Sequence, residues 1–198
     1  MRFQQLHNYI EENKPEVFLE IGTWNGNNAK HCMSLGVKRY VGFDVFEEGS
    51  DELDQIENNV KKRVSEEDVR KVLGDVELIK GNTRKTLPEY VKDKTAFVDV
   101  ALIDGGHSSV TIRSDLMSLL KVMKPTGAIF LDDYYFKCPN PDIGSNTVLG
   151  DLRVPYTVLP VIDKVKGGYF TKMARIDMRN VPTKNWNMPE EISWKYEP

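Results

Sequence analysis

The sequence predicts an α/β fold in which a mostly parallel sheet lies between two layers of helices, a three-layer sandwich. Short runs rich in β-branched and aromatic residues alternate with stretches of helical periodicity, which is typical of strand–helix–strand units. A second observation is the glycine-containing turn at residues 20–26, where the first strand should pass into a helix. No internal repeat interrupts this pattern, so we expect one domain over 1–198, with a core over 16–177 and a tail over 178–198.

The expected helices and strands follow one another in order along the chain. Phe3, Leu6 and Ile10 repeat at helical spacing, which predicts a leading helix over residues 2–13. The strands expected in the parallel part of the sheet are 16–21, 39–43, 76–80, 97–103 and 128–131. The helices expected between them lie at 27–35, within the charged segment 50–73, through Leu87 and Val91, and at 108–123.

The last third of the chain predicts a different arrangement. Residues 124–127, Lys-Pro-Thr-Gly, should end the preceding helix and begin the fifth strand. The segment 137–156 is rich in Pro, Asn, Gly and Asp, so we expect a loop over one rim of the sheet. Residues 156–161 and 169–176 are joined around a Gly-Gly pair and predict a closing antiparallel hairpin, which brings the expected sheet to seven strands.

Length, charge and cysteine content narrow the class of protein. A chain of 198 residues with 29% charged residues is typical of a globular protein with a full core. Its net charge of −3 creates no field that would attract nucleic acid or an anionic membrane. We also expect no membrane span, because no apolar run approaches roughly 18 residues, and no signal peptide. Cys32 and Cys138 lack metal-binding or redox spacing, so we expect two free thiols in a reducing cytoplasm.

Positions in and after the glycine turn indicate a ligand site. Gly22 allows an unusual backbone angle and a close approach to a ligand, and Gly26 permits tight packing at the start of the next helix. Glu20 would repel a pyrophosphate but can accept hydrogen bonds from a cationic amino-acid ligand. Asp44, 24 residues later at the end of the second strand, is placed to accept hydrogen bonds from ribose hydroxyls. The alternative is purely structural: turn glycines and a helix-capping aspartate.

This arrangement resembles the class I S-adenosylmethionine (SAM)-dependent methyltransferases, which have a Rossmann-like fold. In that family the acid-x-Gly-x-x-x-Gly turn after the first strand cradles the methionyl part of SAM, and the acid of the second strand holds the ribose. Trp24 stands where many members have glycine, a departure found in a subgroup with larger residues there. Asn82 and Thr83 would lie near the adenine, although such residues are usually turn formers. The cofactor contacts implied by the resemblance are Glu20, Gly22, Thr23, Trp24, Gly26, Asp44, Asn82, Thr83 and Asp104.

A group of carboxylates follows the fourth and fifth strands. Asp104 ends one of these strands and Asp132 and Asp133 end the other, and neighbouring parallel strands bring their carboxyl ends to one crevice. Three carboxylates there would repel one another without a cation. Oxygen ligands of this kind suit Mg²⁺, Ca²⁺ or Mn²⁺. The cationic sulfonium of SAM is the alternative partner for them.

His107 is the candidate general base. It follows Asp104 by three residues on a Gly-Gly turn, titrates near neutrality, and could remove a proton from a substrate hydroxyl. A lone histidine is more often an exposed loop residue or a helix N-cap, and we keep that interpretation for His7 and His31. The place of His107 among the aspartates favours a catalytic function instead.

The Asp-Gly-Gly-His segment at 104–107, with Asp-Asp-Tyr at 132–134, resembles metal-dependent sugar O-methyltransferases that act on macrolide glycosides, and cephalosporin-hydroxylase-like proteins. It is similar, more distantly, to catechol O-methyltransferases. The resemblance covers about residues 16–136 and implies a divalent metal at Asp104, Asp132 and Asp133, with His107 as the base. It therefore implies methyl transfer to a hydroxyl of a small, polyhydroxylated acceptor, in which the metal lowers the pKa of the attacking oxygen.

Three other functions remain open. The same fold could methylate nitrogen or a protein side chain without metal. An NAD-dependent oxidoreductase could use the turn and Asp44, but it would need a G-x-G-x-x-G sequence, whereas Trp24 and Asn27 stand at its second and third glycines. A non-catalytic SAM-binding protein is disfavoured by the intact aspartates and His107. The sequence specifies neither the acceptor nor the oligomeric state, and a homo-oligomer stays open.

Overall fold

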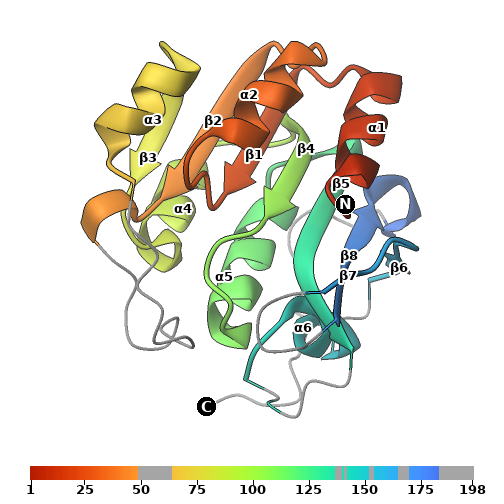
Figure 1. The fold of residues 1–198 in the computed structure, drawn as a ribbon. Helices are drawn as coiled ribbons and strands as arrows, with labels where there is room; N and C mark the ends of the chain where they lie inside the picture. Colours follow the sequence, from red (N-terminus) through yellow and green to blue (C-terminus); the bar gives the residue numbers. More distant parts are fainter. Residues whose placement is uncertain (49–63, 137–139, 141, 152–153, 165–169, 183–198) are drawn as a thin grey trace.

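The computed structural model arranges the chain as one mixed sheet flanked by helices (Figure 1). The residues outside the structural description are 49–63, 137–139, 141, 152–153, 165–169 and 183–198. Part of the charged segment expected to be helical, Cys138 and most of the predicted C-terminal tail therefore lie outside the described residues.

Eight strands form the sheet in the order β3-β2-β1-β4-β5-β8-β6, with β7 paired to β8. The strands are β1 Val17–Ile21, β2 Arg39–Asp44, β3 Glu77–Lys80, β4 Val98–Ile103, β5 Met123–Phe136, β6 Thr157–Val158, β7 Asp163–Lys164 and β8 Phe170–Asp177. The pairs among β1 to β5 are parallel, and β8 runs antiparallel to β5, β6 and β7. The predicted α/β fold, mostly parallel with antiparallel C-terminal strands, is confirmed.

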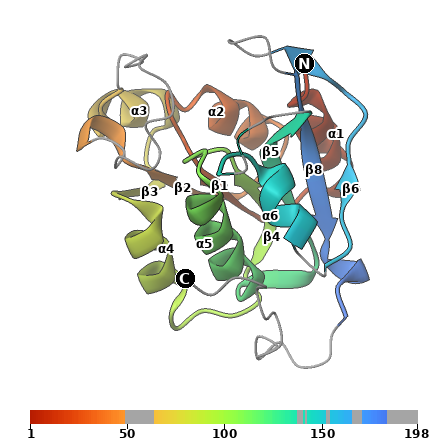
Figure 2. The same ribbon diagram turned by 90° about the horizontal axis from the view of Figure 1, so that it is seen from below.

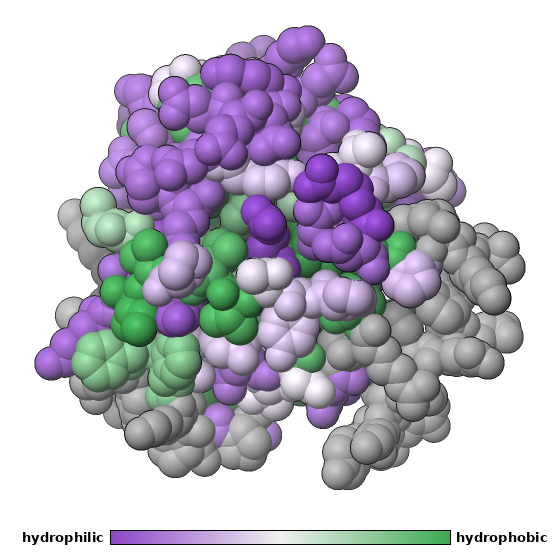
Figure 3. All heavy atoms as spheres, turned by 90° about the vertical axis from the view of Figure 1, so that its right-hand side faces the viewer, coloured by the Kyte–Doolittle hydropathy of each residue, from purple (hydrophilic) through white to green (hydrophobic). Residues whose placement is uncertain are grey.

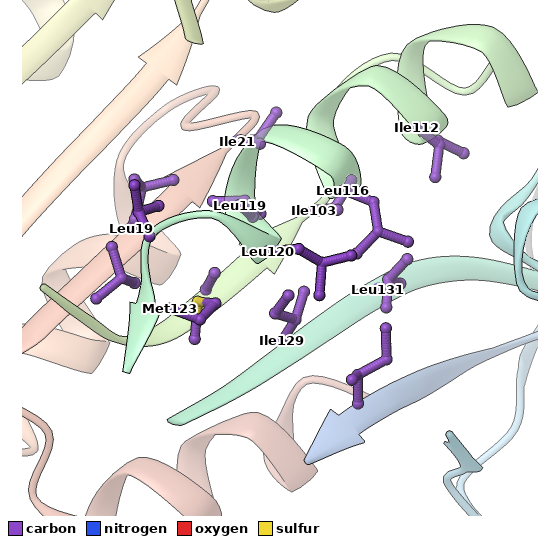
Figure 4. Packing of buried hydrophobic residues seen from close by; sticks show 14 of the residues in the cluster. Leu19, Ile21, Ile103, Ile112, Leu116, Leu119, Leu120, Met123, Ile129 and Leu131 are labelled. Carbon is purple, nitrogen blue, oxygen red and sulfur yellow. The ribbon is translucent and has the colours of Figure 1, made fainter. Parts of the chain in front are cut away.

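Helices cover both faces of this sheet. They are α1 Gln4–Asn13, α2 Asn27–Ser34, α3 Glu66–Leu73, α4 Thr83–Val91, α5 Ser109–Leu120 and α6 Ser145–Asp151, with short 3-10 turns at Phe46–Glu48 and Met178–Asn180. Figure 2 shows α1, α2 and α3 on one side of the strands and α4 and α5 on the other. Leu116 and Ile129 belong to the buried cluster beneath α4, α5 and α6 (Figure 4), and Leu6 and Phe130 to the cluster beneath α1 to α3. Neighbours on β5 therefore serve opposite faces, as the strand period requires.

Polar side chains set the starts of three helices. Ser65, Asn82 and Ser108 each accept a hydrogen bond from a backbone N–H in the first turn of α3, α4 and α5. Such caps stabilise helix starts because the first N–H groups have no partner within the helix. The cap at Ser108 has a functional consequence, since it starts α5 at Ser109 and leaves His107 in the loop before the helix.

The fifth strand begins earlier than predicted. α5 ends at Leu120 and β5 runs from Met123 to Phe136, so the prediction that residues 124–127 end the helix and begin a strand over 128–131 is wrong. Asp132 and Asp133 therefore lie within β5 and not after it. The pairing of β4 with β5 shifts register between Val98 and Val100, and such an irregularity accommodates proline and glycine within a strand. A Cβ on Gly127 would also lie 2.6 Å from the Asp99 carbonyl oxygen, so the close approach needs glycine.

Two further predictions change in the last third of the chain. The expected loop over 137–156 contains helix α6, because Val148 and Leu149 are buried in the core, and burial outweighs the loop-like composition. The predicted hairpin is present, since β6 pairs antiparallel with β8. An additional short strand, β7, raises the number of strands from seven to eight because residues 163–164 also pair with β8.

The N-terminal segment lies beside β5 and β8 (Figure 1). The face of the molecule viewed from this side carries hydrophilic residues in its upper part and hydrophobic residues lower down (Figure 3). Among the described helices, none combines the length and the apolar character needed to span a bilayer.

Candidate active site

The candidate site lies at the carboxyl ends of β1 and β4 and beside the second half of β5, and these three strands are neighbours in the sheet. Ile21 pairs with Ile103, and Ile103 pairs with Leu131, so the residues that follow these positions emerge side by side. The strand order reverses at β1, which has β2 on one side and β4 on the other. Such a switch point is where open α/β sheets bind ligands.

The glycine turn packs directly against the residues that follow β4. Gly22 has φ +92°, and a Cβ there would lie 2.0 Å from the Asp104 carbonyl oxygen, so only glycine fits. Gly26, at the start of α2, has φ +75° and packs against the Leu73 side chain. Trp24 also has positive φ, 47°, and its residue is 55% exposed, so this bulky side chain stands at the rim and not in the core.

Glu20 lies beneath the turn and is only 2% exposed. Its carboxylate oxygens accept hydrogen bonds from Asn28 Nδ2 at 2.6 Å and Tyr40 Oη at 2.5 Å. Burial raises the pKa of Glu20 to about 7, although both hydrogen bonds oppose that shift. The structure therefore gives Glu20 protein partners on both oxygens. Its predicted contact with SAM stays a prediction.

A hydrogen-bonded chain leads from Glu20 to α1. His7 Nε2 lies 2.8 Å from Asn28 Oδ1, and the His7 ring packs edge-on against the His31 ring at 4.4 Å between centroids. Since Asn28 Oδ1 can only accept, His7 donates, and the Asn28 amide is then oriented with Nδ2 toward Glu20. His7 is thus a half-buried helical residue that orients Asn28, and the prediction of an exposed loop residue or N-cap is wrong for it.

Asp44 joins the glycine turn to the end of β2. Its carboxylate accepts hydrogen bonds from the backbone N–H of Trp24 at 2.7 Å and of Phe46 at 2.8 Å. The backbone N–H of Gly81 donates to the Asp44 carbonyl at 2.9 Å, which places the start of α4 beside this carboxylate. Asn82 caps that helix, and Thr83 is buried at its first position. The predicted ribose and adenine positions are therefore adjacent in space.

The three aspartates converge as the sequence predicts. One carboxylate oxygen each from Asp104, Asp132 and Asp133 lie within 4.8 Å of one another. Burial and the two neighbouring carboxylates raise the pKa of Asp104 well above its usual range. Burial also raises the pKa of Asp132. Both shifts favour a proton within the cluster, which relieves part of the repulsion.

Arg2 completes this acidic cluster of Asp104, Asp132 and Asp133, and the sequence analysis missed it. Its Nε and Nη2 atoms lie 2.5 Å and 2.6 Å from the two oxygens of Asp132. Its backbone N–H donates to Asp163 on β7 at 2.8 Å. No local sequence pattern could reveal a contact across 130 positions.

His107 pairs with the third aspartate. Its Nδ1 atom lies 2.5 Å from Asp133 Oδ2, and the Tyr135 hydroxyl donates to Asp133 Oδ1 at 2.9 Å. Burial opposes ionisation of Asp133, but the hydrogen bonds from His107 and Tyr135 prevail and lower its pKa. Asp133 has φ +55° at a register shift between β5 and β8. This bulge turns the Asp133 carboxylate toward His107, a strained arrangement of the kind found at functional sites.

The segment before α6 holds the His107 loop from the other side. Gly144 N–H donates to the His107 carbonyl at 2.9 Å, and Ser109 N–H donates to the Asp142 carbonyl at 2.7 Å. Asn146 Oδ1 accepts a hydrogen bond from the Tyr135 backbone N–H at 3.2 Å. These supporting residues also escaped the sequence analysis. The one signal for Tyr135 is strand alternation, which places it two residues after Asp133 once β5 is known to run to Phe136.

The acidic cluster fits a divalent cation by its donor set, since buried carboxylate oxygens within a few ångströms of one another are the ligands that Mg²⁺ and Mn²⁺ prefer. The charge of Arg2 at Asp132 is the observation that bears against such an ion. The pairing of His107 with Asp133 provides a base with a fixed ring orientation. Together these groups can accept a proton and hold oxygen atoms of a small molecule.

Comparison with known proteins identifies methyltransferases as the relatives of this chain. Residues 19–134 match the family described as methyltransferase domain. The fold is similar to the O-methyltransferase TomG from Streptomyces achromogenes, involved in tomaymycin synthesis, in complex with SAM (17% identity, 88% of this chain and 78% of that chain, TM-score 0.62). It is also similar to the O-methyltransferase from Bacillus cereus in complex with SAH (16%, 88% and 79%, 0.62) and to an rRNA methylase from Streptococcus thermophilus (16%, 89% and 96%, 0.59). No curated protein matches the sequence significantly.

Proposed function

Since this chain belongs to the methyltransferase-domain family and is a class I SAM-dependent methyltransferase, we propose that it methylates a hydroxyl oxygen of a small, polyhydroxylated, sugar-like acceptor. The single observation that carries this proposal is the pairing of His107 with Asp133 beside Asp104 and Asp132. An oriented base next to a group of oxygen ligands suits deprotonation of a hydroxyl. Methylation of an amine nitrogen through its own lone pair needs no such arrangement.

His107 is the residue that takes the proton in this proposal. With Nδ1–H donating to Asp133, the imidazole lone pair lies on Nε2, which becomes the basic atom. Proton transfer from the acceptor hydroxyl to Nε2 produces an imidazolium, and the Asp133 carboxylate stabilises that charge at 2.5 Å. Tyr135 keeps the second oxygen of Asp133 occupied and so helps to hold its orientation.

The glycine turn and the end of β2 are proposed to bind the cofactor. Bound SAM supplies an electrophilic methyl group on a positively charged sulfur, and S-adenosylhomocysteine leaves once that methyl forms its bond to oxygen. Gly22 lets the turn lie directly against the Asp104 backbone, and Asp44 would accept hydrogen bonds from the ribose beside Asn82 and Thr83. The negative charge below the turn, on Glu20, would favour the ammonium end of the methionyl group.

Asp104, Asp132 and Asp133 are proposed to hold a divalent cation, with Mg²⁺ as the expected ion. Such an ion would supply positive charge that lowers the pKa of the attacking hydroxyl. The three carboxylates would also orient acceptor hydroxyls near His107, so that alignment contributes to the rate.

The other candidate functions are supported to different degrees. A dehydrogenase of the dinucleotide-binding class has the parallel order 3-2-1-4-5-6, whereas here an antiparallel strand, β8, lies between β5 and β6. Family membership argues against that class as well. Metal-independent methylation of nitrogen or of a protein remains the competing proposal, and the binding of SAM without catalysis is the second.

Product detection tests the proposal directly. Methyl-labelled SAM would be incubated with the chain and with panels of glycosides, catechols, amines and peptides, and labelled products would be identified by mass spectrometry. We expect an O-methyl ether from a polyhydroxylated acceptor, and loss of that product when a chelator removes divalent ions. An N-methyl product, or turnover that a chelator leaves unchanged, would contradict the acceptor class or the metal role, respectively.

A further inference from the structure

Arg2 contacts the acidic cluster through both oxygens of one carboxylate, from a segment far from β4 and β5 in sequence. Its guanidinium binds both oxygens of Asp132, with Nε to Oδ1 at 2.5 Å and Nη2 to Oδ2 at 2.6 Å. The Asp132 side chain is 1% exposed and that of Arg2 is 16% exposed, so water screens this pair only weakly. Two parallel charge-assisted hydrogen bonds of this kind are stronger and more directional than an ordinary surface ion pair.

The position of Arg2 is itself held by contacts on two sides. Its backbone N–H donates to Asp163 Oδ2 at 2.8 Å, and its Nη1 lies 3.4 Å from the same oxygen. Its guanidinium also lies over the Phe3 ring, 5.1 Å from the centroid. The segment before α1 is thereby attached to β7 and to β5 at once. An arginine anchored through both its main chain and its side chain is not an incidental surface contact.

The remaining members of the acidic cluster have protein partners as well. Asp104 lies with an oxygen within 4.8 Å of those of Asp132 and Asp133, and Asp133 is hydrogen-bonded to His107 and Tyr135. With Arg2 in place the cluster therefore contains its own positive charge. A divalent ion that took an oxygen of Asp132 would lie close to the guanidinium, and two cations that share one carboxylate repel each other strongly where water is scarce.

We propose that Arg2 is the internal cation of the acidic cluster, and that it and a divalent cation are alternative occupants of Asp132. This inference rests on the metal role in the proposed function. Metal binding must then release the Arg2 side chain from Asp132 and loosen the segment before α1. The metal affinity of the site is in consequence set partly by a residue far from the ligands in sequence. Because the coupling is reciprocal, a variant that removes Arg2 should bind the ion more tightly.

The test measures Mn²⁺ alone, without SAM, acceptor or turnover. Electron paramagnetic resonance of free Mn²⁺ would give the affinity of the unaltered chain and of Arg2→Met, which keeps an unbranched side chain of similar reach but no charge. Arg179→Met is the matched control. Arg179 makes the same two-pronged contact with Asp177, through Nε at 2.9 Å and Nη2 at 2.6 Å. Asp177 pairs with Ala128 at the last residue of β8, whereas Asp132 and Asp133 lie opposite the middle of that strand.

We expect Arg2→Met to bind Mn²⁺ at least tenfold more tightly and Arg179→Met to bind it like the unaltered chain. Equal affinities for Arg2→Met and the unaltered chain would overturn the proposal. Failure of all three to bind Mn²⁺ would overturn it too, together with the metal role, while leaving methyl transfer to be judged by product detection.

Arg2→Lys keeps the inference testable if Arg2→Met does not fold. Lysine retains the charge but cannot bind both carboxylate oxygens in a planar fork. The Mn²⁺ affinity of Arg2→Lys should lie between that of the unaltered chain and that of Arg2→Met. If Arg2→Met does not fold, Arg2→Lys should still bind Mn²⁺ more tightly than the unaltered chain. An affinity equal to that of the unaltered chain would count against competition at Asp132.

Discussion

His107 Nδ1 lies 2.5 Å from a carboxylate oxygen of Asp133, a residue that reaches this position only through a left-handed backbone conformation. The strand β5 bulges at this residue, and the Tyr135 hydroxyl holds the other oxygen. The pair resembles the orienting contact of a general base, in which a carboxylate selects the ring tautomer and stabilises the imidazolium. Four predictions follow from this pair and from the turn beside it.

The first prediction concerns the pair itself. His107→Ala should reduce turnover by roughly 10²-fold or more, since general-base catalysis typically contributes about that factor. SAM affinity should change little, because His107 follows β4 outside the glycine turn. Isothermal titration with SAM and product formation would be measured together, with His31→Ala as the control. A loss of SAM affinity comparable to the loss of turnover would remove His107 from the role of base.

The second prediction separates the charge of Asp133 from its conformation. Asp133→Asn tolerates the positive φ of 55°, because asparagine adopts this region more readily than most residues. It removes the negative charge that faces His107, so turnover should fall by roughly tenfold or more while the melting temperature changes little. The pH–rate profile of the variant should also shift, because its histidine loses a carboxylate partner. An unchanged profile would contradict an electrostatic role for Asp133.

The third prediction concerns Gly22. A Cβ at this position would lie 2.0 Å from the Asp104 carbonyl oxygen, and φ is +92°, so Gly22→Ala must push β1 and β4 apart. We expect a loss of stability of about 2 kcal/mol or more and loss of SAM binding. Gly150→Ala is the matched control, because nothing lies within 4 Å of its Cβ position in α6. Denaturant unfolding would compare the two, and equal effects would contradict the close approach.

The fourth prediction concerns the pH dependence of stability. Glu20 has a pKa of about 7 in the folded chain, above its ordinary value of 4.5, because it is buried. The folded state therefore holds this proton more tightly than the unfolded state. The contribution of Glu20 to the free energy of unfolding should fall as pH rises from about 4.5 to 7 and level off above that, by on the order of 1 to 3 kcal/mol.

Glu20→Gln isolates this contribution. Glutamine has no proton to lose in this range, so the difference in unfolding free energy between the variant and the unaltered chain should depend on pH between 5 and 8. Tyr40 and Asn28 donate to Glu20, and Asp44 and Cys32 interact with it electrostatically. These groups are the same in both proteins. A difference that does not vary with pH would place the Glu20 pKa outside this window.

The sequence predicted those site residues that are brought together by the pairing of neighbouring strands. Asp104 follows Ile103 and Asp132 follows Leu131, and these two residues pair on adjacent parallel strands, so the meeting of the aspartates requires only the correct strand order and register. Asp44 and Gly22 are brought together in the same way, because β1 and β2 pair in register. For these residues the period of the hydrophobic pattern is sufficient, since it locates each strand and hence the residue at its end.

Other members of the site depended on contacts that no local pattern records. Arg2 reaches Asp132 across 130 positions, and His7 reaches Asn28 from a different helix. Helix α6 forms where composition indicated a loop, because Val148 and Leu149 find an apolar surface there. In each case the free energy comes from burial or from a charge partner that only the folded chain supplies.

The sequence by itself therefore determined the α/β architecture, the turn that requires glycine and the convergence of three aspartates, since each follows from periodicity and from the direction of parallel strands. Tertiary structure decided which partner each of those aspartates receives. The bulge in β5 turns Asp133 toward His107, and the segment before α1 delivers Arg2 to Asp132. The physical reason is that hydrogen bonds and charge pairs act over a few ångströms, so they are settled only when packing has brought distant segments of the chain within that range.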